Sequence, residues 1–187
     1  MRQAFLADCR RVHRLDAIST PRLLQAIGGS QGLKALLGYR LGRHLQLLRQ
    51  QRRQPLLRVF GWPLYWLISG YARQALDIHL DLSADIGPGL YIGHFGDIAL
   101  RGCTLGSHCS IAQSVHIEPN ADETQGPTIG DRVWIGGHAR IVGTWQIGSR
   151  STVGAGAEVK RDIPEGALFM GRPGRVVMSD YDNTDIL

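Results

Sequence analysis

Apolar residues recur at every sixth position through the second half of this 187-residue chain. The unbroken run consists of Ile129, Ile135, Ile141, Ile147, Val153 and Val159. Six residues are too few for a helical repeat, so each unit must be a short strand followed by a turn. Three such units close one triangular coil, and stacked coils satisfy one another's backbone groups. The repeat therefore predicts a parallel β-solenoid whose interior is filled by the periodic residues.

The same register continues upstream of this run. It is kept by Leu105, Ile111 and Ile117, and by the earlier pair Ile86 and Ile92. Glycine directly follows many of the periodic residues, which lets the chain turn a tight corner. The polar stretch "EPNADETQGPT" between Ile117 and Ile129 predicts a loop that leaves the solenoid.

The first half has a helical period instead. Leucines from Leu33 to Leu48 recur at three- and four-residue steps with arginines between them, which predicts a basic amphipathic helix. "STPRLL" is typical of a helix start, "GSQG" of a turn, and Gly61 with Pro63 should break or kink the helical segment that Pro55 opens. We divide the chain into a helical region over residues 1–75, a β-helix over 76–166, and a tail over 167–187. The tail packs on the last coil and frays at its end.

Charge differs sharply between the two halves. Residues 1–75 contain thirteen Lys/Arg and two Asp/Glu, whereas residues 76–187 contain eight and fourteen. Either the two modules are solvated differently, or the basic half meets an anionic surface such as membrane headgroups or a phosphorylated lipid carrier. The aromatic patch with Trp62, Tyr65 and Trp66 either packs on another subunit or lies at a bilayer surface. No nucleic-acid-binding motif accompanies the charge.

Cysteine usage and hydropathy indicate the compartment. Cys9, Cys103 and Cys109 form no CxxC pair, which indicates a reducing cytoplasm and no zinc site. The first residues lack the apolar core of a signal peptide, and no apolar run reaches the roughly 18 residues of a spanning helix. We expect a cytoplasmic protein, either free in the cytoplasm or peripheral at the inner face of the membrane.

Four segments carry a family resemblance: "DIGPGLYIGHFGDI", "CSIAQSVHIE", "VWIGGHARIVG" and "VGAGAEVKRDIPEGALFMGRPGRVV". They resemble the hexapeptide-repeat acyltransferases, in the serine acetyltransferase-like branch. Within that branch the chain is most similar to members that O-acetylate sugars for bacterial exopolysaccharides, such as colanic acid acetyltransferases. The resemblance implies a mainly β fold, a left-handed parallel β-helix preceded by helices. It also implies acetyl transfer from acetyl-CoA to a hydroxyl of a sugar or glycan intermediate.

The resemblance assigns His94 the role of general base, which removes the proton of the acceptor hydroxyl. Histidine suits this step because its pKa lies near working pH. Gly93 and Gly96 leave the imidazole clear, and a backbone N–H would hold the oxyanion. The alternative is a turn histidine without a catalytic role. His116, just before the loop, is a candidate substrate-binding residue, and no metal site is expected because three suitably placed ligands are not evident.

The chain departs from true serine acetyltransferases at two places. They carry aspartate directly before the histidine and Arg-His-Pro in the loop, where this chain has Gly93 and "TQGP". A neutral Gln125 cannot hold the carboxylate of an amino acid as arginine does. The sequence therefore favours a sugar acceptor, with serine O-acetylation and a non-catalytic assembly module as alternatives. Asp97 and Glu118 are candidates to orient His94 in place of the missing aspartate.

The resemblance also places coenzyme A in a groove between two prisms. Gly137 and Ala155 would contact the pantetheine through their backbones. The candidates for the phosphates are Lys160, Arg161, Arg172 and Arg175. Because one β-helix wall cannot enclose coenzyme A, we expect a homotrimer or a dimer of trimers.

Overall fold

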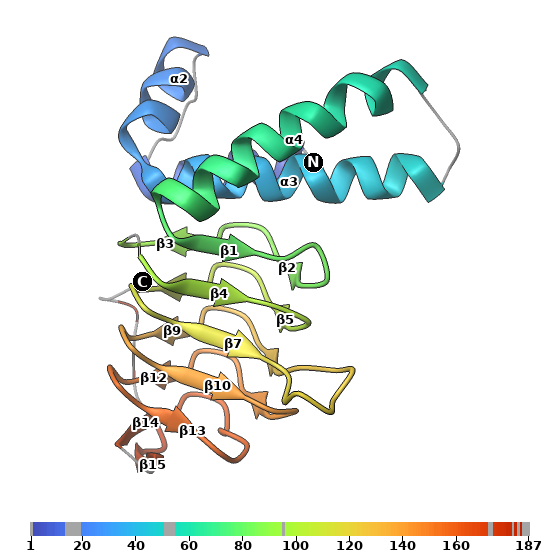
Figure 1. The fold of residues 1–187 in the computed structure, drawn as a ribbon. Coiled ribbons are helices and arrows are strands. Elements are labelled where there is room, and N and C mark those ends of the chain that lie inside the picture. The colour runs from blue at the N-terminus through green and yellow to red at the C-terminus, as the bar shows by residue number, and fades with distance from the viewer. Residues whose placement is uncertain are drawn as a thin grey trace.

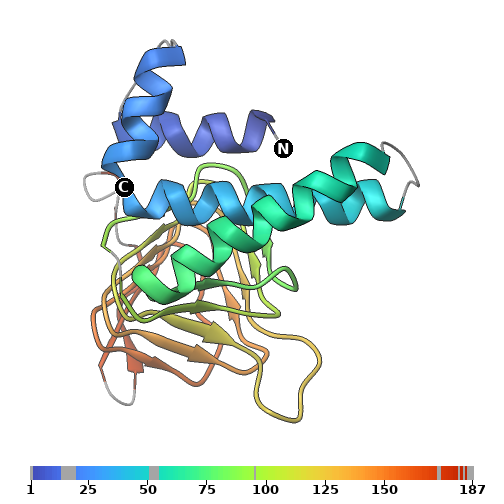
Figure 2. The ribbon, with the colours of Figure 1, turned by 45° about the horizontal axis from the view of Figure 1, so that its top comes forward.

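A computed structural model describes residues 2–13, 20–50, 55–94, 96–171, 174–180, 182 and 184. Four helices come first: α1 (Arg2–His13), α2 (Thr20–Gly29), α3 (Gln31–Gln50) and α4 (Pro55–Ala75). A β-helix follows as a column beneath them (Figure 1). α3 and α4 lie across its first coil (Figure 2). The predicted fold class, helices followed by a parallel β-helix, is confirmed.

The column has three sheets, each built from one short strand per coil. The front sheet, which faces the viewer in Figure 1, comprises β1 (Ile78–Leu80), β4 (Ile98–Leu100), β7 (His116–Glu118), β10 (Arg140–Val142) and β13 (Glu158–Val159). The second sheet comprises β2 (Asp85–Ile86), β5 (Thr104–Leu105), β8 (Thr128–Ile129) and β11 (Gln146–Ile147). The third sheet comprises β3 (Tyr91–Ile92), β6 (Ser110–Ile111), β9 (Trp134–Ile135), β12 (Thr152–Val153), β14 (Leu168–Gly171) and β15 (Gly174–Met178).

The coils wind in a left-handed sense. In Figure 1 the chain runs to the right along the front sheet, returns to the left behind it and descends by one strand per circuit. Successive strands pair in parallel, for example Leu80 with Leu100 and Leu100 with Ile117. Only β15 reverses direction, since it pairs antiparallel with β14 and ends the third sheet as a hairpin. Residues 181, 183 and 185–187 of the tail that we predicted to fray lie outside the described residues.

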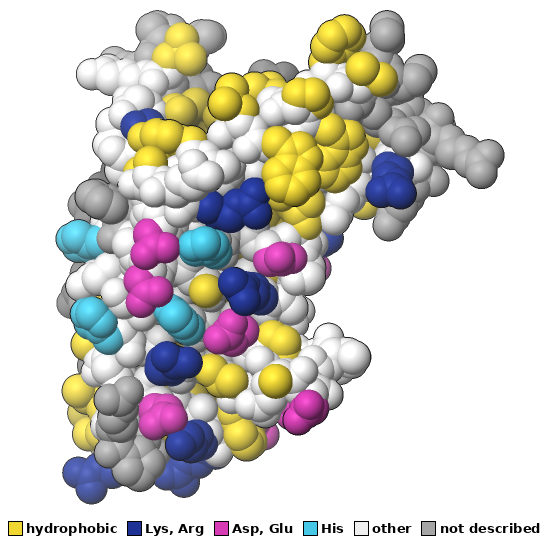
Figure 3. Space-filling view, viewed as in Figure 1, with side chains coloured by type: hydrophobic (Ala, Val, Ile, Leu, Met, Phe, Trp, Pro, Cys, Tyr) yellow, Lys and Arg dark blue, Asp and Glu magenta, His cyan; other side chains and the backbone are white. Residues whose placement is uncertain are grey.

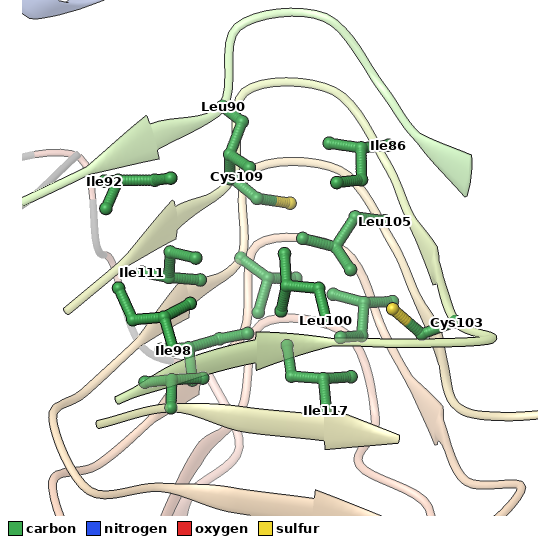
Figure 4. Packing of buried hydrophobic residues seen from close by; sticks show 14 of the residues in the cluster. Ile86, Leu90, Ile92, Ile98, Leu100, Cys103, Leu105, Cys109, Ile111 and Ile117 are labelled. Carbon is green, nitrogen blue, oxygen red and sulfur yellow. The ribbon is translucent and has the colours of Figure 1, made fainter. Parts of the chain in front are cut away.

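The six-residue repeat fills the interior of the column. All of its members from Ile86 to Val159 are at most 5% exposed. Figure 4 shows Ile86, Ile92, Ile111 and Ile117 pointing inward from the three sheets. Burying such a side chain contributes roughly 1.5–3 kcal/mol. Burial of this stack therefore stabilises the β-helix.

Glycines after the periodic residues let neighbouring coils approach. A Cβ on Gly87 would lie 2.6 Å from the carbonyl group of Gly106, and a Cβ on Gly106 would lie 2.6 Å from that of Gly130. A side chain at these positions would push the coils apart. The sequence suggests that these glycines allow tight corners. In the structure they allow the backbones of neighbouring coils to approach closely.

Two edges of the column turn through a residue with positive φ in every coil. The first, between the third and front sheets, is called the His94 edge here and has at that position Asp77, Asp97, Ser114, His138 and Gly156. The second, between the second and third sheets, is called the Arg132 edge and has Gly89, His108, Arg132, Arg150 and Gly166. The remaining edge carries the predicted loop over residues 119–127, which projects from the column (Figure 1).

A buried ion pair attaches the helices to the open end of the β-helix. Arg40 of α3 contacts the two carboxylate oxygens of Asp8 of α1 at 3.0 and 3.2 Å. Arg40 also donates to the carbonyls of Ile86 and Gly87, and Asp8 accepts from two backbone N–H groups of the next corner. Burial raises the pKa of Asp8 above its ordinary value, an effect that Arg40 only partly offsets. These two side chains satisfy backbone groups that a preceding coil would otherwise pair.

α4 continues through Gly61 and Pro63, so the break that the sequence predicts does not occur. Small residues bring α3 and α4 close together. A Cβ on Gly61 would lie 2.6 Å from the Leu45 side chain, and one on Gly42 would lie 2.6 Å from the Tyr65 ring. We attribute the continuity of α4 to this packing, which offsets the hydrogen bond that Pro63 cannot donate.

One side of α4 is apolar and uncovered in the single chain. This α4 face consists of Val59, Phe60, Leu64, Trp66, Leu67 and Tyr71, which are 46–73% exposed. The Arg73 guanidinium lies 5.5 Å from the centre of the Trp66 ring. Figure 3 shows hydrophobic side chains gathered over α4, whereas charged side chains and histidines predominate over the front sheet. Among the described helices, none has the length and hydropathy needed to cross a membrane.

Candidate active site

His94 lies on the His94 edge, in the corner between β3 and β4. Leu100 follows Ile92 by eight residues across this corner, whereas Ile117 follows Ile111, the strand partner of Ile92, by six, so the corner contains two extra residues. The Gly93 N–H donates to the Ile111 carbonyl at 2.9 Å, which anchors the start of the corner to the next coil. His94 is exposed, and we find no hydrogen bond or ion pair between its imidazole and any described residue. The imidazole is therefore accessible for proton transfer.

Two carboxylate–imidazole pairs lie at the same edge. Asp77 Oδ1 is 3.1 Å from His79 Nε2, and Asp97 Oδ1 is 2.8 Å from His116 Nε2. The pairs are linked, because Asp77 Oδ2 accepts a hydrogen bond from the Asp97 N–H at 3.0 Å. Both aspartates have left-handed backbone conformations, with φ of 52° and 51°. Aspartate tolerates this region better than most residues, so the corner and the pairing suit the same residue type.

The two carboxylates that we considered as orienting partners of His94 contact other side chains. Asp97 binds His116, and Glu118 Oε2 lies 4.0 Å from Arg101 Nη1. The structure thus joins Asp97 and His116 into one unit near His94. The hypothesis that Asp97 or Glu118 orients His94 has no contact in its favour.

A groove of about 410 Å³ continues over the front sheet in the coils after His116. It is lined by Asn120, Arg140, Val142, Trp145, Glu158, Val159 and Lys160. Arg140 is exposed and is the direct strand partner of His116. We find no ion pair of Arg140 with another described residue. A cation suited to a carboxylate therefore stands beside the His116–Asp97 pair.

The projecting loop itself supplies no cation. Gln125 is exposed within it, and the neighbouring Gly126 N–H donates to the Gly102 carbonyl at 2.9 Å. Residues 119–127 include Asp122 and Glu123 but no Lys or Arg. Any positive charge for an anionic acceptor must come from the sheet rather than from the loop.

The two predicted pantetheine contacts, Gly137 and Ala155, share the His94 edge in later coils. The Gly156 N–H donates to the Gly137 carbonyl at 2.8 Å, so these corners stack directly. Gly137 is buried and Ala155 is exposed. The structure thus brings His94, Gly137 and Ala155 to one edge, along which an extended thioester arm could lie.

The predicted phosphate contacts are dispersed. Lys160 Nζ pairs with Glu158 Oε1 at 3.0 Å in the groove, and Arg161 follows it in the chain. Arg175 is exposed on β15 of the third sheet, and Arg172 lies outside the described residues. The described candidates therefore lie on two sides of the column rather than in one cluster.

The cysteines do not provide a nucleophile. Burial raises the pKa of Cys103 to about 12, and raises those of Cys9 and Cys109 to about 11. All three are therefore protonated, buried thiols at neutral pH. No group of three or more His, Cys, Asp or Glu within the described residues could hold a metal ion.

Sequence reasoning missed Asp77, His79 and Arg140 as members of this site. A signal for Asp77 existed, because "DIHL" at residues 77–80 and "DIAL" at residues 97–100 are equivalent positions of successive coils. The outward position of Arg140 follows from the same register, since it lies directly before the periodic Ile141.

The fold and site define a class: a left-handed hexapeptide-repeat β-helix with an exposed corner histidine. Known proteins of similar sequence and structure are serine acetyltransferases. The Synechococcus elongatus enzyme is 31% identical over 114 residues, which cover 59% of this chain and 47% of that protein. The Mycobacterium tuberculosis enzyme is 29% identical over 190 residues, which cover 95% and 73%. The solved structure of soybean serine acetyltransferase complexed with serine is 29% identical, with a TM-score of 0.72 and coverage of 94% and 69%.

The likeness extends over the helices as well as the β-helix, since two of these matches cover nearly the whole chain. The chain spans about half the length of the Synechococcus relative and of the Bacillus subtilis one. No family model matches the chain. These relatives point to the serine acetyltransferase-like branch of hexapeptide-repeat acyltransferases, and the likeness to its exopolysaccharide members stays a prediction.

Proposed function

We propose that the chain is an acetyl-CoA-dependent O-acetyltransferase with His94 as its general base. The observation that carries this proposal is the exposed imidazole at the lengthened corner of a β-helix similar to serine acetyltransferases. The helical region over residues 1–75 would serve assembly or surface attachment, and the β-helix over residues 76–166 would carry the chemistry.

The reaction follows from the placement of His94. Its neutral imidazole takes the proton of the acceptor hydroxyl as that oxygen attacks the thioester carbonyl. The tetrahedral intermediate carries an oxyanion, which a backbone N–H of the edge would stabilise without reorganisation. When the intermediate collapses, the C–S bond breaks and the proton held by His94 passes to the departing thiolate. His94 therefore accepts the proton in the first step and returns it in the second, so the imidazole is neutral again at the end of the reaction.

We propose serine as the first acceptor to test. The neighbours in sequence and structure are serine acetyltransferases, one of them solved with serine, although the loop sequence favoured a sugar. Arg140 offers the carboxylate of serine the positive charge that Gln125 lacks, and it stands beside His116 in the groove. A sugar hydroxyl, as in exopolysaccharide precursors, is the second candidate because the loop is acidic and has no cation.

The first experiment replaces His94 with alanine. His94 is exposed, so thermal unfolding should stay unchanged while acetyl transfer falls by about two to four powers of ten. Thiol release from acetyl-CoA measures the rate. The control is His138→Asn, which removes an exposed imidazole from the same edge with a residue that tolerates its positive φ. Thiol release by His94→Ala at the unmodified rate would refute the assignment of the base.

The second experiment tests the acceptor through Arg140. With L-serine, Arg140→Gln should raise KM about tenfold or more and change kcat little, because a charge-assisted contact to the carboxylate is lost. Serinamide, which has no carboxylate, should be a poor acceptor for both forms and insensitive to the substitution. If the unmodified protein acetylates sugars and not serine, the acceptor assignment is wrong while that of His94 stands.

We propose further that the chain forms a homotrimer, or a dimer of trimers, in the cytoplasm. A single wall of the β-helix leaves the His94 edge open, so a second copy would complete the groove for coenzyme A. The basic helical half and the α4 face would hold the assembly at an anionic membrane surface. Light scattering at micromolar concentration checks the assembly, and a monomeric mass would contradict it.

A further inference from the structure

The Arg132 edge places cations on successive coils, away from the site described above. Its positive-φ position holds His108, Arg132 and Arg150 in turn. The Arg132 N–H donates to the Ser107 carbonyl and the Arg150 N–H to the Asp131 carbonyl, both at 2.8 Å. These residues therefore stack one strand spacing apart, about 4.8 Å. His108 suits this backbone, whereas Arg132 and Arg150 adopt a conformation that glycine, Asn, Asp and His adopt more readily. Successive coils therefore present basic side chains at this edge.

α1 lies against this edge and adds two more cations. Arg11 Nη2 donates to Ser110 Oγ at 2.8 Å and Nη1 donates to the His108 carbonyl, which fixes the guanidinium against the corner. Burial lowers the pKa of Arg11, and the nearby Arg132 lowers it further. Arg10 is the next residue on α1 and is exposed. The helix and the edge thus form two walls that are both positively charged.

A cleft of about 620 Å³ lies between these walls. It is lined by Ala7, Arg10, Arg11, His108, Arg132 and Thr184. The described lining includes three guanidinium groups and one imidazole, and it contains no carboxylate and no Phe, Tyr or Trp. Its volume falls within the range of small-molecule sites, roughly 300–1,000 Å³. Guanidinium groups match phosphate oxygens in a bidentate manner, and a partly desolvated one binds an anion more strongly than an exposed one.

We propose that this cleft binds a small polyanion of the oligophosphate or phosphorylated-metabolite class. The site is separate from the His94 edge, because the two edges lie at opposite ends of the strands of the third sheet. Because three of the six described lining residues are arginines and none is Phe, Tyr or Trp, recognition depends mainly on charge and phosphate geometry. Because α1 also holds the first coil through Asp8, a ligand here would brace the junction between helices and β-helix.

The test is calorimetric titration of the full chain with sodium pyrophosphate at constant ionic strength. We expect saturable binding to the unmodified protein, weakened at least about tenfold by Arg10→Gln with Arg132→Gln. The matched control is Arg150→Gln on the same edge. Arg150 does not line the cleft and pairs with Glu165 at 2.6 Å, so its loss should leave the affinity almost unchanged. Arg10→Gln alone, at an exposed position, provides the test if the double variant does not fold.

Three outcomes would overturn the proposal. Heat from pyrophosphate no greater than that from chloride at equal ionic strength would mean that there is no site. Equal weakening by Arg150→Gln would mean diffuse attraction to the whole edge. Displacement of pyrophosphate by pantetheine, which carries no phosphate, would make the cleft part of the donor site. None of these outcomes depends on acetyl transfer, so the experiment tests the anion site independently of the proposed acetyltransferase function.

Discussion

The β-helix buries its periodic apolar residues, whereas the helical half leaves many of its large apolar residues exposed. Every periodic residue of the β-helix is at most 5% exposed, whereas α4 leaves six large apolar side chains 46–73% exposed. The β-helix is covered by its own repetition, because each coil provides the next with partners for both side chains and backbone. The helical half has no such repeat, and none of the residues that the structure describes covers one side of α4.

Each half depends on contacts with a partner: the first coil of the β-helix with the helices, and the helices with the β-helix and a further surface. The first coil of the β-helix has no coil before it, so it depends on α1 and α3 through Asp8 and Arg40. The helices in turn depend on the β-helix at one side and on another surface at the α4 face. Stability should therefore be lost most readily at the junction and in the column, and least readily on α4.

The largest effect is expected at the junction. Asp8→Ala should lower the free energy of unfolding by about 3–5 kcal/mol, because it leaves the buried Arg40 without its carboxylate. The matched control is Asp85→Ala, which removes the exposed ion pair of Asp85 with Arg43 between α3 and β2. An exposed pair is worth about 1 kcal/mol at most. Urea unfolding measures both, and equal losses would show that burial of the Asp8–Arg40 pair has no special role.

A slightly smaller effect is expected inside the column. Ile117→Ala should cost about 2–5 kcal/mol, because the fully buried side chain leaves a cavity between coils that cannot collapse. Leu67→Ala removes a comparable side chain from the α4 face and should change stability by no more than about 0.5 kcal/mol. Thermal and urea unfolding of dilute protein provide the comparison. A loss at Leu67 as large as that at Ile117 would show that the α4 face is already buried in the assembled protein.

Much of this fold could be predicted because the repeat is strict. A period of six admits only short strands and turns, and every periodic residue points inward as expected. The helices were harder to predict. α1 falls within the predicted helical region but was not predicted as a separate helix, since its role lies in tertiary contacts of Asp8 and Arg11 with distant corners. The helix through Pro63 depends on the packing of Gly61 and Gly42 against neighbours far along the chain.

The candidate site could be predicted only in part. His94 is identifiable because its flanking glycines are local in sequence, but its surroundings depend on which residues stack across coils. Asp97 lies in the corner of one coil and His116 on the strand of the next coil, 19 residues later. Stacking of the two coils brings their side chains within hydrogen-bond distance. The two-residue insertion in the His94 corner shifts that register. Residue spacing alone therefore did not show that Asp97 pairs with His116 rather than with His94.

The smallest effect per residue is expected for membrane binding by the helical half, through its basic residues and the apolar α4 face. Residues 1–75 carry thirteen Lys/Arg against two Asp/Glu, and a cation near an anionic membrane contributes about 1 kcal/mol. The full chain should float with phosphatidylglycerol vesicles at low salt, release in high salt, and ignore phosphatidylcholine vesicles. Phe60→Ser with Leu67→Ser should weaken flotation, whereas Val177→Ser, an exposed apolar position on β15 at the far end of the column, should not. Protein that stays unbound at low salt would assign the α4 face to subunit contact, and the same double substitution should then lower the mass in light scattering.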